Sequence, residues 1–319
     1  MKDNCYQLLS IAINCYQLLS IAINCYQLLS IAFISPFAGD SSLIRESLLE
    51  GQFLEVFIEY GVEEAIQAGM SDMCIVTGRG KHSLMDHFDK NYELEHQIMG
   101  TSKESLLDDI RDLIDSASYT YIRQREMKGL GHAILTGREL VGDEPFAVVL
   151  ADDLCVNEQQ GVLAQMVALY KQFRCSIVAV QEVPEPETHK YGVISGEMIK
   201  DDIFRIDDMV EKPEPGTAPS NLAIIGRYIL TPDIFELIEQ TEPGKGGEIQ
   251  ITDALLKQAQ SGCVLAYKFK GKRFDCGSVE GYIEATNHCF ETFYKKAPSA
   301  ELAKKPTVKV VEEKEAEVV

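Results

Sequence analysis

The length, composition and charge of the chain predict a globular protein and exclude some partners. The chain has 319 residues, 45% hydrophobic and 25% charged, which suits one large α/β unit or two smaller domains. Asp and Glu number 50 against 30 Lys and Arg, for a net charge of -20, and such a surface repels nucleic acid and anionic lipid. We therefore expect no nucleic-acid partner, and an anionic ligand needs a local cluster of positive charge.

The chain opens with one ten-residue phrase, NCYQLLSIAI, stated three times between Asn4 and Phe33, with Phe as the last letter of the third copy. No charge lies between Asp3 and Asp40, a length that raises the question of a membrane span. Each copy nevertheless carries Asn, Gln, Tyr and Ser, which are costly at mid-bilayer. We therefore do not expect a membrane segment, and an anchor over residues 5–37 remains the open alternative.

The cysteines favour a reducing compartment. Three of the nine belong to the repeat, and the others show no CxxC pair or metal-ligand spacing. A cytoplasmic location is the simplest interpretation.

From residue 58 onward, helix and strand patterns alternate. Apolar residues at helical spacing predict a helix over 58–69, and FAVVLADD, from Phe146 to Asp153, predicts a buried strand. Such alternation, with continuous apolar strands, predicts an α/β fold with a mixed, mainly parallel sheet covered on both faces. Further strands are expected at 73–78, 118–124, 175–183, 191–199, 203–213, 221–230 and 264–271 and on the approach to FDCG, and further helices at 82–88, 93–99, 104–115, 132–140, 162–173, 231–240, 251–260 and 281–296.

Three segments follow from this pattern. Residues 1–57 form an atypical amino-terminal segment, and 58–294 form the α/β domain. Residues 295–319 form the third segment. Within it, APSAELAKKPTVKVVEEKEAEVV mixes both charges and has no aromatic residue and little periodicity, which predicts a disordered tail.

Carboxylates at strand ends are candidates for a metal site. Asp152 and Asp153 stand at the carboxyl end of the strand from Phe146, and Asp275 stands at another strand end before a glycine turn. Magnesium uses oxygen ligands and often only one or two protein carboxylates. An isolated Asp-Asp pair more often caps a turn, so the pair alone leaves both interpretations open.

A second group of candidates lies in the turns. In VEKP, Glu211 and Lys212 end a strand, and extended geometry predicts that they point to opposite faces. Lysine can neutralise a phosphate and glutamate can accept hydrogen bonds from sugar hydroxyls, although a solvated charged turn is common. KGLGHA places Gly129 and Gly131 before a helix, but the third glycine of a dinucleotide fingerprint is absent.

Taken together, these pieces resemble the bacterial UTP-glucose-1-phosphate uridylyltransferases. The resemblance rests on the order of GVEEAIQAG, IVTGRGK, KGLGHAIL, GDEPFAVVLADD, YGVI, VEKP, PGKGGEIQITDAL and KGKRFDCGSVEGY, and it runs from about Ile58 to about Tyr294. It implies a nucleotide-binding α/β domain, usually in homo-oligomers, that makes UDP-glucose and pyrophosphate from UTP and glucose-1-phosphate.

The resemblance also implies residue roles. Asp152 and Asp275 are similar to the family's magnesium ligands, Lys212 to its sugar-phosphate contact and Glu211 to its glucose-hydroxyl contact. The positions that read uracil match Gln124 and Gly129, and Gly192 matches a position where the sugar approaches the backbone.

The amino terminus departs from the family. The family's first strand ends in a glycine-rich loop, PAAGxGTRxLPxTKxxPKEMLP, whose amides and basic residues cradle the triphosphate. Here the repeat and FISPFAGDSSLIRESLLEGQFLEVF stand instead, with Asp40 after PFAG and no lysine between Lys2 and Lys81. Because losing one preorganised donor costs about 10²–10³ in rate, we expect impaired activity.

The altered amino terminus leaves two hypotheses about whether the chain is catalytically active. YQLLSIA is apolar enough to supply the missing strand, but three equivalent copies leave the register unspecified. The first hypothesis is a working uridylyltransferase with a rebuilt amino terminus, and the alternative is a non-catalytic remnant that lacks the triphosphate loop.

Overall fold

The computed structural model describes residues 19–22, 30–33, 58–79, 81–101, 103–104 and 107–294. The PFAG segment and the predicted tail over 295–319 lie outside these ranges. Within the ranges, no helix combines the length and the apolar character that crossing a membrane requires.

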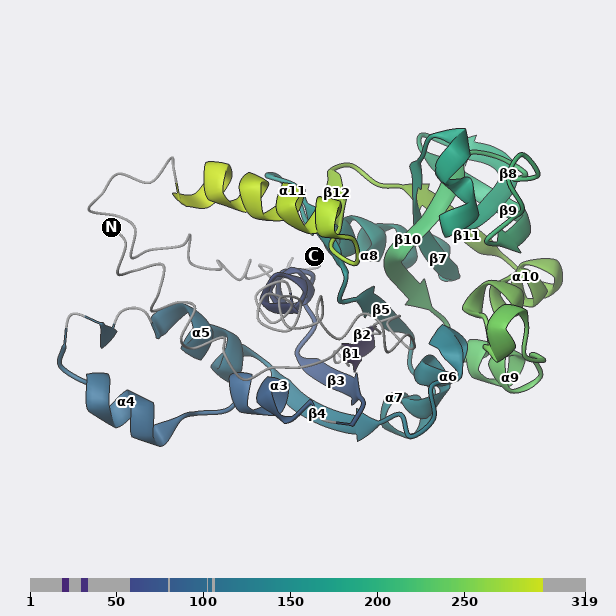
Figure 1. Ribbon diagram of the computed structural model, residues 1–319. Helices are drawn as coiled ribbons and strands as arrows, with labels where there is room; N and C mark the ends of the chain where they lie inside the picture. Colours follow the sequence, from purple (N-terminus) through teal and green to yellow (C-terminus); the bar gives the residue numbers. More distant parts are fainter. Residues whose placement is uncertain are drawn as a thin grey trace, which may run out of the picture.

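A ten-stranded mixed sheet forms the centre of the described part of the chain (Figure 1). Its order is β1-β3-β2-β5-β10-β7-β11-β9-β8, and β4 pairs with the outer side of β3. The pairings give β2, β3, β4, β5, β7, β8 and β11 one direction and β1, β9 and β10 the other. The prediction of a mixed, mainly parallel sheet is therefore confirmed.

The elements have the following bounds. The strands of the large sheet are β1 Leu19–Ala22, β2 Ser30–Phe33, β3 Asp72–Thr77, β4 Ser118–Arg123, β5 Phe146–Leu150, β7 Ser176–Glu182, β8 Gly192–Lys200, β9 Ile203–Glu211, β10 Leu222–Leu230 and β11 Val264–Lys268. A two-stranded sheet pairs β6 Asp153–Val156 with β12 Lys272–Asp275. The helices are 58–67, α3 His82–His87, α4 Tyr92–Ile98, α5 Asp108–Ser116, α6 Gly129–Thr136, α7 Arg138–Val141, α8 Val162–Phe173, α9 Ile234–Glu239, α10 Ile251–Ser261 and α11 Val279–Cys289, with short helical turns η3 Glu185–Lys190, η4 Lys245–Gly247 and η5 Phe290–Tyr294.

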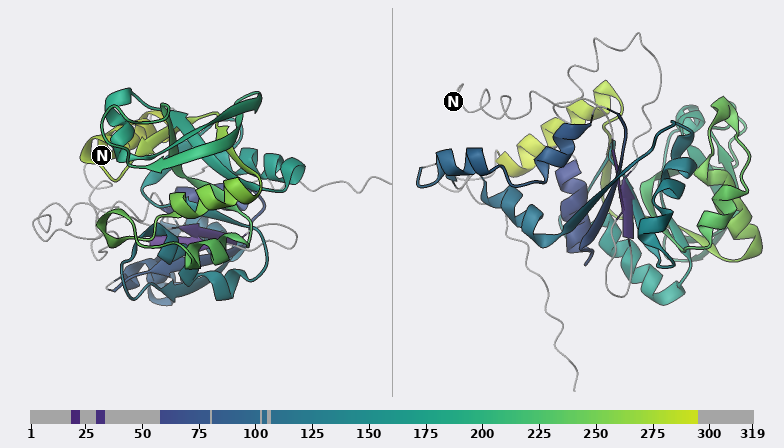
Figure 2. Two further views of the ribbon diagram at one scale, coloured as in Figure 1. Left: turned by 90° about the vertical axis from the view of Figure 1, so that its right-hand side faces the viewer. Right: turned by 90° about the horizontal axis from the view of Figure 1, so that it is seen from below.

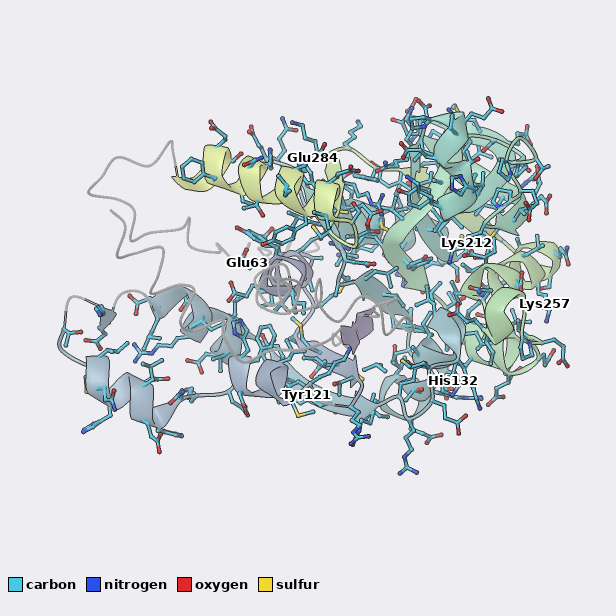
Figure 3. All side chains as sticks on the ribbon, in the orientation of Figure 1. Glu63, Tyr121, His132, Lys212, Lys257 and Glu284 are labelled. Atoms are coloured by element: carbon cyan, nitrogen blue, oxygen red, sulfur yellow. The ribbon has the colours of Figure 1, made fainter. Side chains whose placement is uncertain are left out.

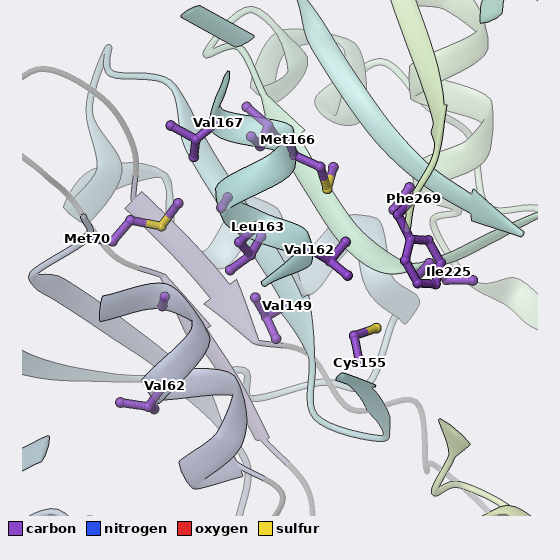
Figure 4. Packing of buried hydrophobic residues seen from close by; sticks show 14 of the residues in the cluster. Val62, Met70, Val149, Cys155, Val162, Leu163, Met166, Val167, Ile225 and Phe269 are labelled. Carbon is purple, nitrogen blue, oxygen red and sulfur yellow. The ribbon is translucent and has the colours of Figure 1, made fainter. Parts of the chain in front are cut away.

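The central strands are mostly apolar, and β5 is apolar along its whole length, because helices cover both faces of the sheet (Figure 2). In β5, Ala147 and Val149 pack toward the helix over 58–67, α3, α5 and α8, whereas Phe146 and Val148 pack toward α6, α9 and α10. Figure 4 shows the first of these two cores, which includes Val62 and in which Val149 of β5 lies close to Leu163 of α8. Successive residues of β5, from Phe146 to Val149, therefore contribute alternately to the two cores.

Two copies of the repeat enter the gap between β3 and β5. The third copy supplies β2, which runs parallel to both neighbours and pairs Ala32 with Cys74 and with Val148. The second copy supplies β1, which runs antiparallel and pairs Ile21 with Ile75 and with Val149. The expectation that a copy of the repeat could serve as the missing strand is confirmed, and two copies, running in opposite directions, pair with β3 and β5.

The strand predicted from Phe146 to Asp153 is shorter than expected. β5 ends at Leu150, Ala151 and Asp152 form a turn, and Asp153 begins β6. The chain leaves the large sheet here because Asp153 pairs with Asp275 in the small sheet. The turn brings Asp152 to the carboxyl edge of β5. In the other strand of the small sheet, β12 ends at Asp275, and α11 begins at Val279.

Candidate functional site

A cavity of about 570 Å³ opens at the carboxyl ends of β3 and β5. Its volume lies within the range of small-molecule sites. All the site residues predicted from the sequence line it, although they come from distant parts of the chain: Gln124, Gly129, Asp152, Gly192, Glu211, Lys212 and Asp275.

The two neighbouring carboxylates Asp152 and Asp153 have different environments. Asp153 is fully engaged: its Oδ2 accepts from the backbone N–H of Gly226 at 2.5 Å, and its Oδ1 accepts from Nε of Arg273 at 2.5 Å. Asp152 is buried, and among the described residues its Oδ1 has no hydrogen-bond partner. Burial, with the charges of Asp153 and Asp275 as smaller causes, raises the pKa of Asp152 to about 8. Asp153 is therefore a structural anchor, and Asp152 is the carboxylate left over for a ligand.

Asp275 is held beside Asp152 by backbone and side-chain contacts. The Cys276 N–H donates to the carbonyl of Asp152 at 2.7 Å, which fixes the two strand ends together. Oδ2 of Asp275 accepts from the Tyr191 hydroxyl at 3.2 Å and lies 3.3 Å from Nη2 of Arg273. Because Arg273 also binds Asp153, one buried guanidinium serves two carboxylates.

This arrangement fits a hard divalent cation. A buried carboxylate oxygen without a partner is costly unless a cation or a proton compensates it. The donors are oxygens, as Mg²⁺ prefers, and two carboxylates leave room for phosphate oxygens and waters. Within the described ranges no group of three or more His, Cys, Asp or Glu residues is placed to hold a metal ion, and Asp152 and Asp275 stay the two candidate carboxylate ligands.

The expectation that Glu211 and Lys212 point to opposite faces is wrong. β9 ends at Glu211, and Lys212 adopts a left-handed conformation with φ of 44°, stabilised by its N–H donating to the carbonyl of Tyr191 at 3.0 Å. Nζ of Lys212 therefore lies 3.9 Å from Oε1 of Glu211. A strained backbone at a non-glycine residue is typical of functional sites. Figure 3 shows Lys212 between the β8–β9 hairpin and α10.

The Glu211 carboxylate is oriented by a second contact. The Thr252 hydroxyl, at the start of α10, donates to Oε2 of Glu211 at 2.5 Å. A Cβ at Gly192 would lie 3.0 Å from the same oxygen and 3.3 Å from Thr252 Oγ1. Glycine at 192 thus keeps the space in front of Glu211 open.

Gln124 and Gly129 form the opposite end of the cavity. Nε2 of Gln124 donates to the carbonyl of Gly129 at 3.3 Å and lies 2.9 Å from Nδ1 of His132, which Figure 3 shows on α6. Gly129 has φ of 87°, and a Cβ there would lie 2.7 Å from Cβ of Glu248. The glycines of KGLG therefore serve a tight turn against the segment before α10, and a dinucleotide fingerprint is not needed to explain them.

Sequence reasoning missed several residues of the cavity. Arg79 and Lys81 follow β3, and Tyr191, Thr252 and Arg273 hold the carboxylates. Burial lowers the pKa of Lys81 to about 7. The IVTGRGK motif was a signal for Arg79 and Lys81, because basic residues after a strand end stand at the edge where ligands bind.

Positive charge concentrates in the cavity although the chain is acidic. The basic side chains of the lining are Arg79, Lys81, Arg125, Lys190, Lys212 and Arg273, and the acidic ones are Asp152, Asp153, Glu211, Glu248 and Asp275. Basic residues thus outnumber acidic ones here, whereas the whole chain has 50 acidic and 30 basic residues. The cavity supplies the local charge that an anionic ligand needs.

The fold and this cavity define a nucleotidyl transferase. Residues 48–292 match the family model described as nucleotidyl transferase, and the chain belongs to that family. Its relatives include two proteins of Pseudomonas aeruginosa, 76% and 72% identical over 239 residues, that are UTP-glucose-1-phosphate uridylyltransferases; each match covers 75% of this chain and 86% of the relative. The uridylyltransferase of Bacillus subtilis is 47% identical over 229 residues, which cover 72% of this chain and 78% of the relative.

Solved structures of UDP-glucose pyrophosphorylases are also similar to this chain. A UDP-glucose pyrophosphorylase in its apo form is 59% identical with a TM-score of 0.71, and one in complex with UDP-glucose is 56% identical with a TM-score of 0.69; both comparisons cover 74% of this chain and 86% of the other. The UTP-bound enzyme of Acinetobacter baumannii is 35% identical with a TM-score of 0.67 and covers 74% of this chain and 82% of its own.

Proposed function

We propose that this chain is a uridylyltransferase that converts UTP and glucose-1-phosphate to UDP-glucose and pyrophosphate. The observation that carries the proposal is the cavity that gathers the seven predicted residues, among them the buried Asp152, whose Oδ1 has no hydrogen-bond partner among the described residues. The relatives carry this activity in their names, and related structures contain UDP-glucose or UTP.

In the proposed reaction a phosphate oxygen of glucose-1-phosphate attacks the α-phosphorus of UTP. The new P–O bond forms as the bond between the α-phosphorus and its bridging oxygen breaks, and pyrophosphate leaves with the electron pair. No covalent protein intermediate is required, so the protein contributes alignment and neutralisation of charge. The proposed roles follow from position: Gln124 and Gly129 bind uracil, and Gly192 admits the sugar.

The charged side chains divide between the two substrates in this proposal. Lys212 contacts the phosphate of glucose-1-phosphate, and Glu211, oriented by Thr252, accepts from the glucose hydroxyls. Arg79 and Lys81, at the carboxyl end of β3, contact the phosphates of UTP. Asp152 and Asp275 would hold Mg²⁺, which when bound neutralises phosphate charge.

Release of pyrophosphate by the full chain with UTP, glucose-1-phosphate and Mg²⁺ tests this proposal. The Asp152→Ala variant, purified in the same way, is the matched control for a contaminating host enzyme. We expect turnover in the wild type that chelation of Mg²⁺ abolishes and that the variant lacks.

The alternative is a non-catalytic member of the family that binds ligands without turnover. The observation in its favour is the sequence between residues 30 and 57, which has no glycine-rich loop of the family type. Equal inactivity of the wild type and Asp152→Ala, with both folded by circular dichroism, would support it, and calorimetric titration with UDP-glucose would then show whether the sugar half of the site still binds.

The proposal includes a cytoplasmic homo-oligomer. Val279, Ile283 and Phe290 are 59%, 51% and 56% exposed and share one face of the α11 and η5 segment, which is suited to contact with a second copy. Light scattering after size-exclusion chromatography gives the assembly, and a monomer would contradict this part of the proposal.

A further inference from the structure

Two cysteines outside the cavity lie side by side at the opposite edge of the sheet. Cys175 directly precedes β7, and Cys263 directly precedes β11. These strands are parallel neighbours with Ser176 paired to Val264, so the same register places Cys175 opposite Cys263. Their sulfur atoms are 3.4 Å apart although 88 positions separate the residues in the sequence.

This geometry suits a disulfide bond. Matched positions on neighbouring strands are about 4.8 Å apart and project to the same face, within the Cα separation of about 4.4–6.8 Å that a disulfide requires. The sulfur atoms need only approach from 3.4 Å to a bond length of about 2.05 Å. A rotation of the two side chains achieves this without movement of the strands.

The two thiols also differ in the way that a stepwise oxidation requires. Cys263 is exposed and can meet a dissolved oxidant, whereas Cys175 is half-buried behind it. The Cys175 thiol donates its hydrogen to the sulfur of Cys263, so the two sulfur atoms already face each other. Cys263 is thus placed for the first attack and Cys175 for the second.

We propose that Cys175 and Cys263 are an oxidant-driven modification site that closes to an intramolecular disulfide. The Cys263 thiolate attacks hydrogen peroxide, forming an S–O bond while the O–O bond breaks and hydroxide leaves to become water. Cys175 then attacks the sulfenic sulfur; the S–S bond forms, the S–O bond breaks, and a second water leaves with the Cys175 proton. Two thiols and one peroxide give one disulfide and two waters.

The position of the pair predicts a staple rather than an inhibitor. Neither cysteine lines the cavity, which lies at the carboxyl ends of the strands. The bond would join the segment after α8 to the segment after α10, and these helices pack on opposite faces of the sheet. A cross-link over a long loop restricts the unfolded chain, so oxidation should raise the melting temperature reversibly.

Peptide mapping of the full chain after mild peroxide treatment identifies the bond. Trypsin releases Cys175 in the peptide 175–190 and Cys263 in the peptide 258–268, and each of these peptides contains only one cysteine. We expect the two to appear as one linked species, a loss of two free thiols per chain, and a rise of about 3–8 °C in melting temperature that a reductant reverses.

Single Cys175→Ser and Cys263→Ser variants separate this bond from oxidation elsewhere, because the repeat carries three further cysteines. Both variants should melt like the reduced wild type and gain nothing from peroxide. The proposal is overturned if the linked peptide is absent while Cys263 is oxidised or capped, or if either variant shows the same rise in melting temperature. Pyrophosphate release is a separate readout and should be equal before and after oxidation.

Discussion

The two ends of the cavity differ in how their side chains are held. At the proposed sugar-phosphate end, Glu211 is fixed by Thr252, and Asp275 is fixed by Tyr191 and Arg273. At the proposed nucleotide end, Arg79 and Lys81 follow β3, whose inner neighbour is supplied by two copies of the repeat. The end with Glu211 and Asp275 is held by contacts between distant parts of the domain. The end with Arg79 and Lys81 depends on the strand position that the repeat fills.

The difference between the two ends predicts which substrate is used less well. The end with Glu211 and Asp275 keeps its geometry whatever fills the gap beside β3, so recognition of the sugar phosphate should survive. The nucleotide end lacks a family-type glycine-rich loop in its sequence and relies on basic side chains after β3. We therefore expect a defect in UTP use to exceed any defect in glucose-1-phosphate use.

The largest expected effect comes from Asp152, the buried residue that we propose as a Mg²⁺ ligand. Asp152→Asn keeps the shape and removes the charge, and we expect kcat/KM to fall by about 10³-fold. The free energy of unfolding should not fall, because Oδ1 of the buried Asp152 carboxyl has no hydrogen-bond partner for the substitution to remove. Pyrophosphate release and urea unfolding measure the two quantities, and an active variant would remove Asp152 from the site.

A comparable effect, on stability, is expected at Arg273. Arg273→Met leaves the buried carboxylate of Asp153 without its ion pair and should lower the free energy of unfolding by about 3–5 kcal/mol. The matched control is Arg205→Met, which breaks an exposed pair with Glu197 and should cost about 1 kcal/mol or less. Urea titrations compare them, and similar losses in both variants would show that the ion pair of Arg273 is unimportant.

A smaller effect separates the two ends by substrate. Lys212→Ala should raise KM for glucose-1-phosphate by about 10–100-fold, the value of one charged hydrogen bond, and leave KM for UTP nearly unchanged. Lys81→Met should do the reverse. Initial rates with one substrate varied at a time measure both constants, and equal shifts for both substrates in either variant would contradict the division.

The smallest expected effect is a dependence on pH. Burial lowers the pKa of Lys81 to about 7, so its side chain gains its positive charge as the pH falls through 7. KM for UTP should therefore decrease several-fold from pH 8 to pH 6. Arginine stays protonated across this range, so Lys81→Arg should flatten that part of the profile. A wild-type profile identical to that of Lys81→Arg would rule out titration of Lys81.

Much of the fold could be predicted from the sequence because each strand and its end are marked by residues that are neighbours in the chain. Apolar runs such as FAVVL predicted buried strands, and the carboxylates after them predicted the edge where the cavity lies. The family-like motifs then identified the lining residues from 124 to 275. The sequence also indicated that a copy of the repeat would fill the empty strand position.

The rest depends on contacts between distant residues. Asp152 and Asp153 look equivalent in the sequence, and they differ because Gly226 and Arg273, 73 and 120 positions away from Asp153, satisfy only Asp153. The direction of the Lys212 side chain could not be predicted either. Extended geometry was the default, but the carbonyl of Tyr191 draws the Lys212 N–H into a left-handed turn.

The repeat has a consequence for inheritance. The tripeptide Ser-Ile-Ala occurs in both strands of the gap, as 20–22 in β1 and 30–32 in β2, and it pairs there in either direction. Ten is an even number, so a shift by one whole copy returns every residue to the same face of a strand. Gain or loss of one copy during DNA replication would leave the same residues available for the sheet. The fold therefore places little selection on the number of copies.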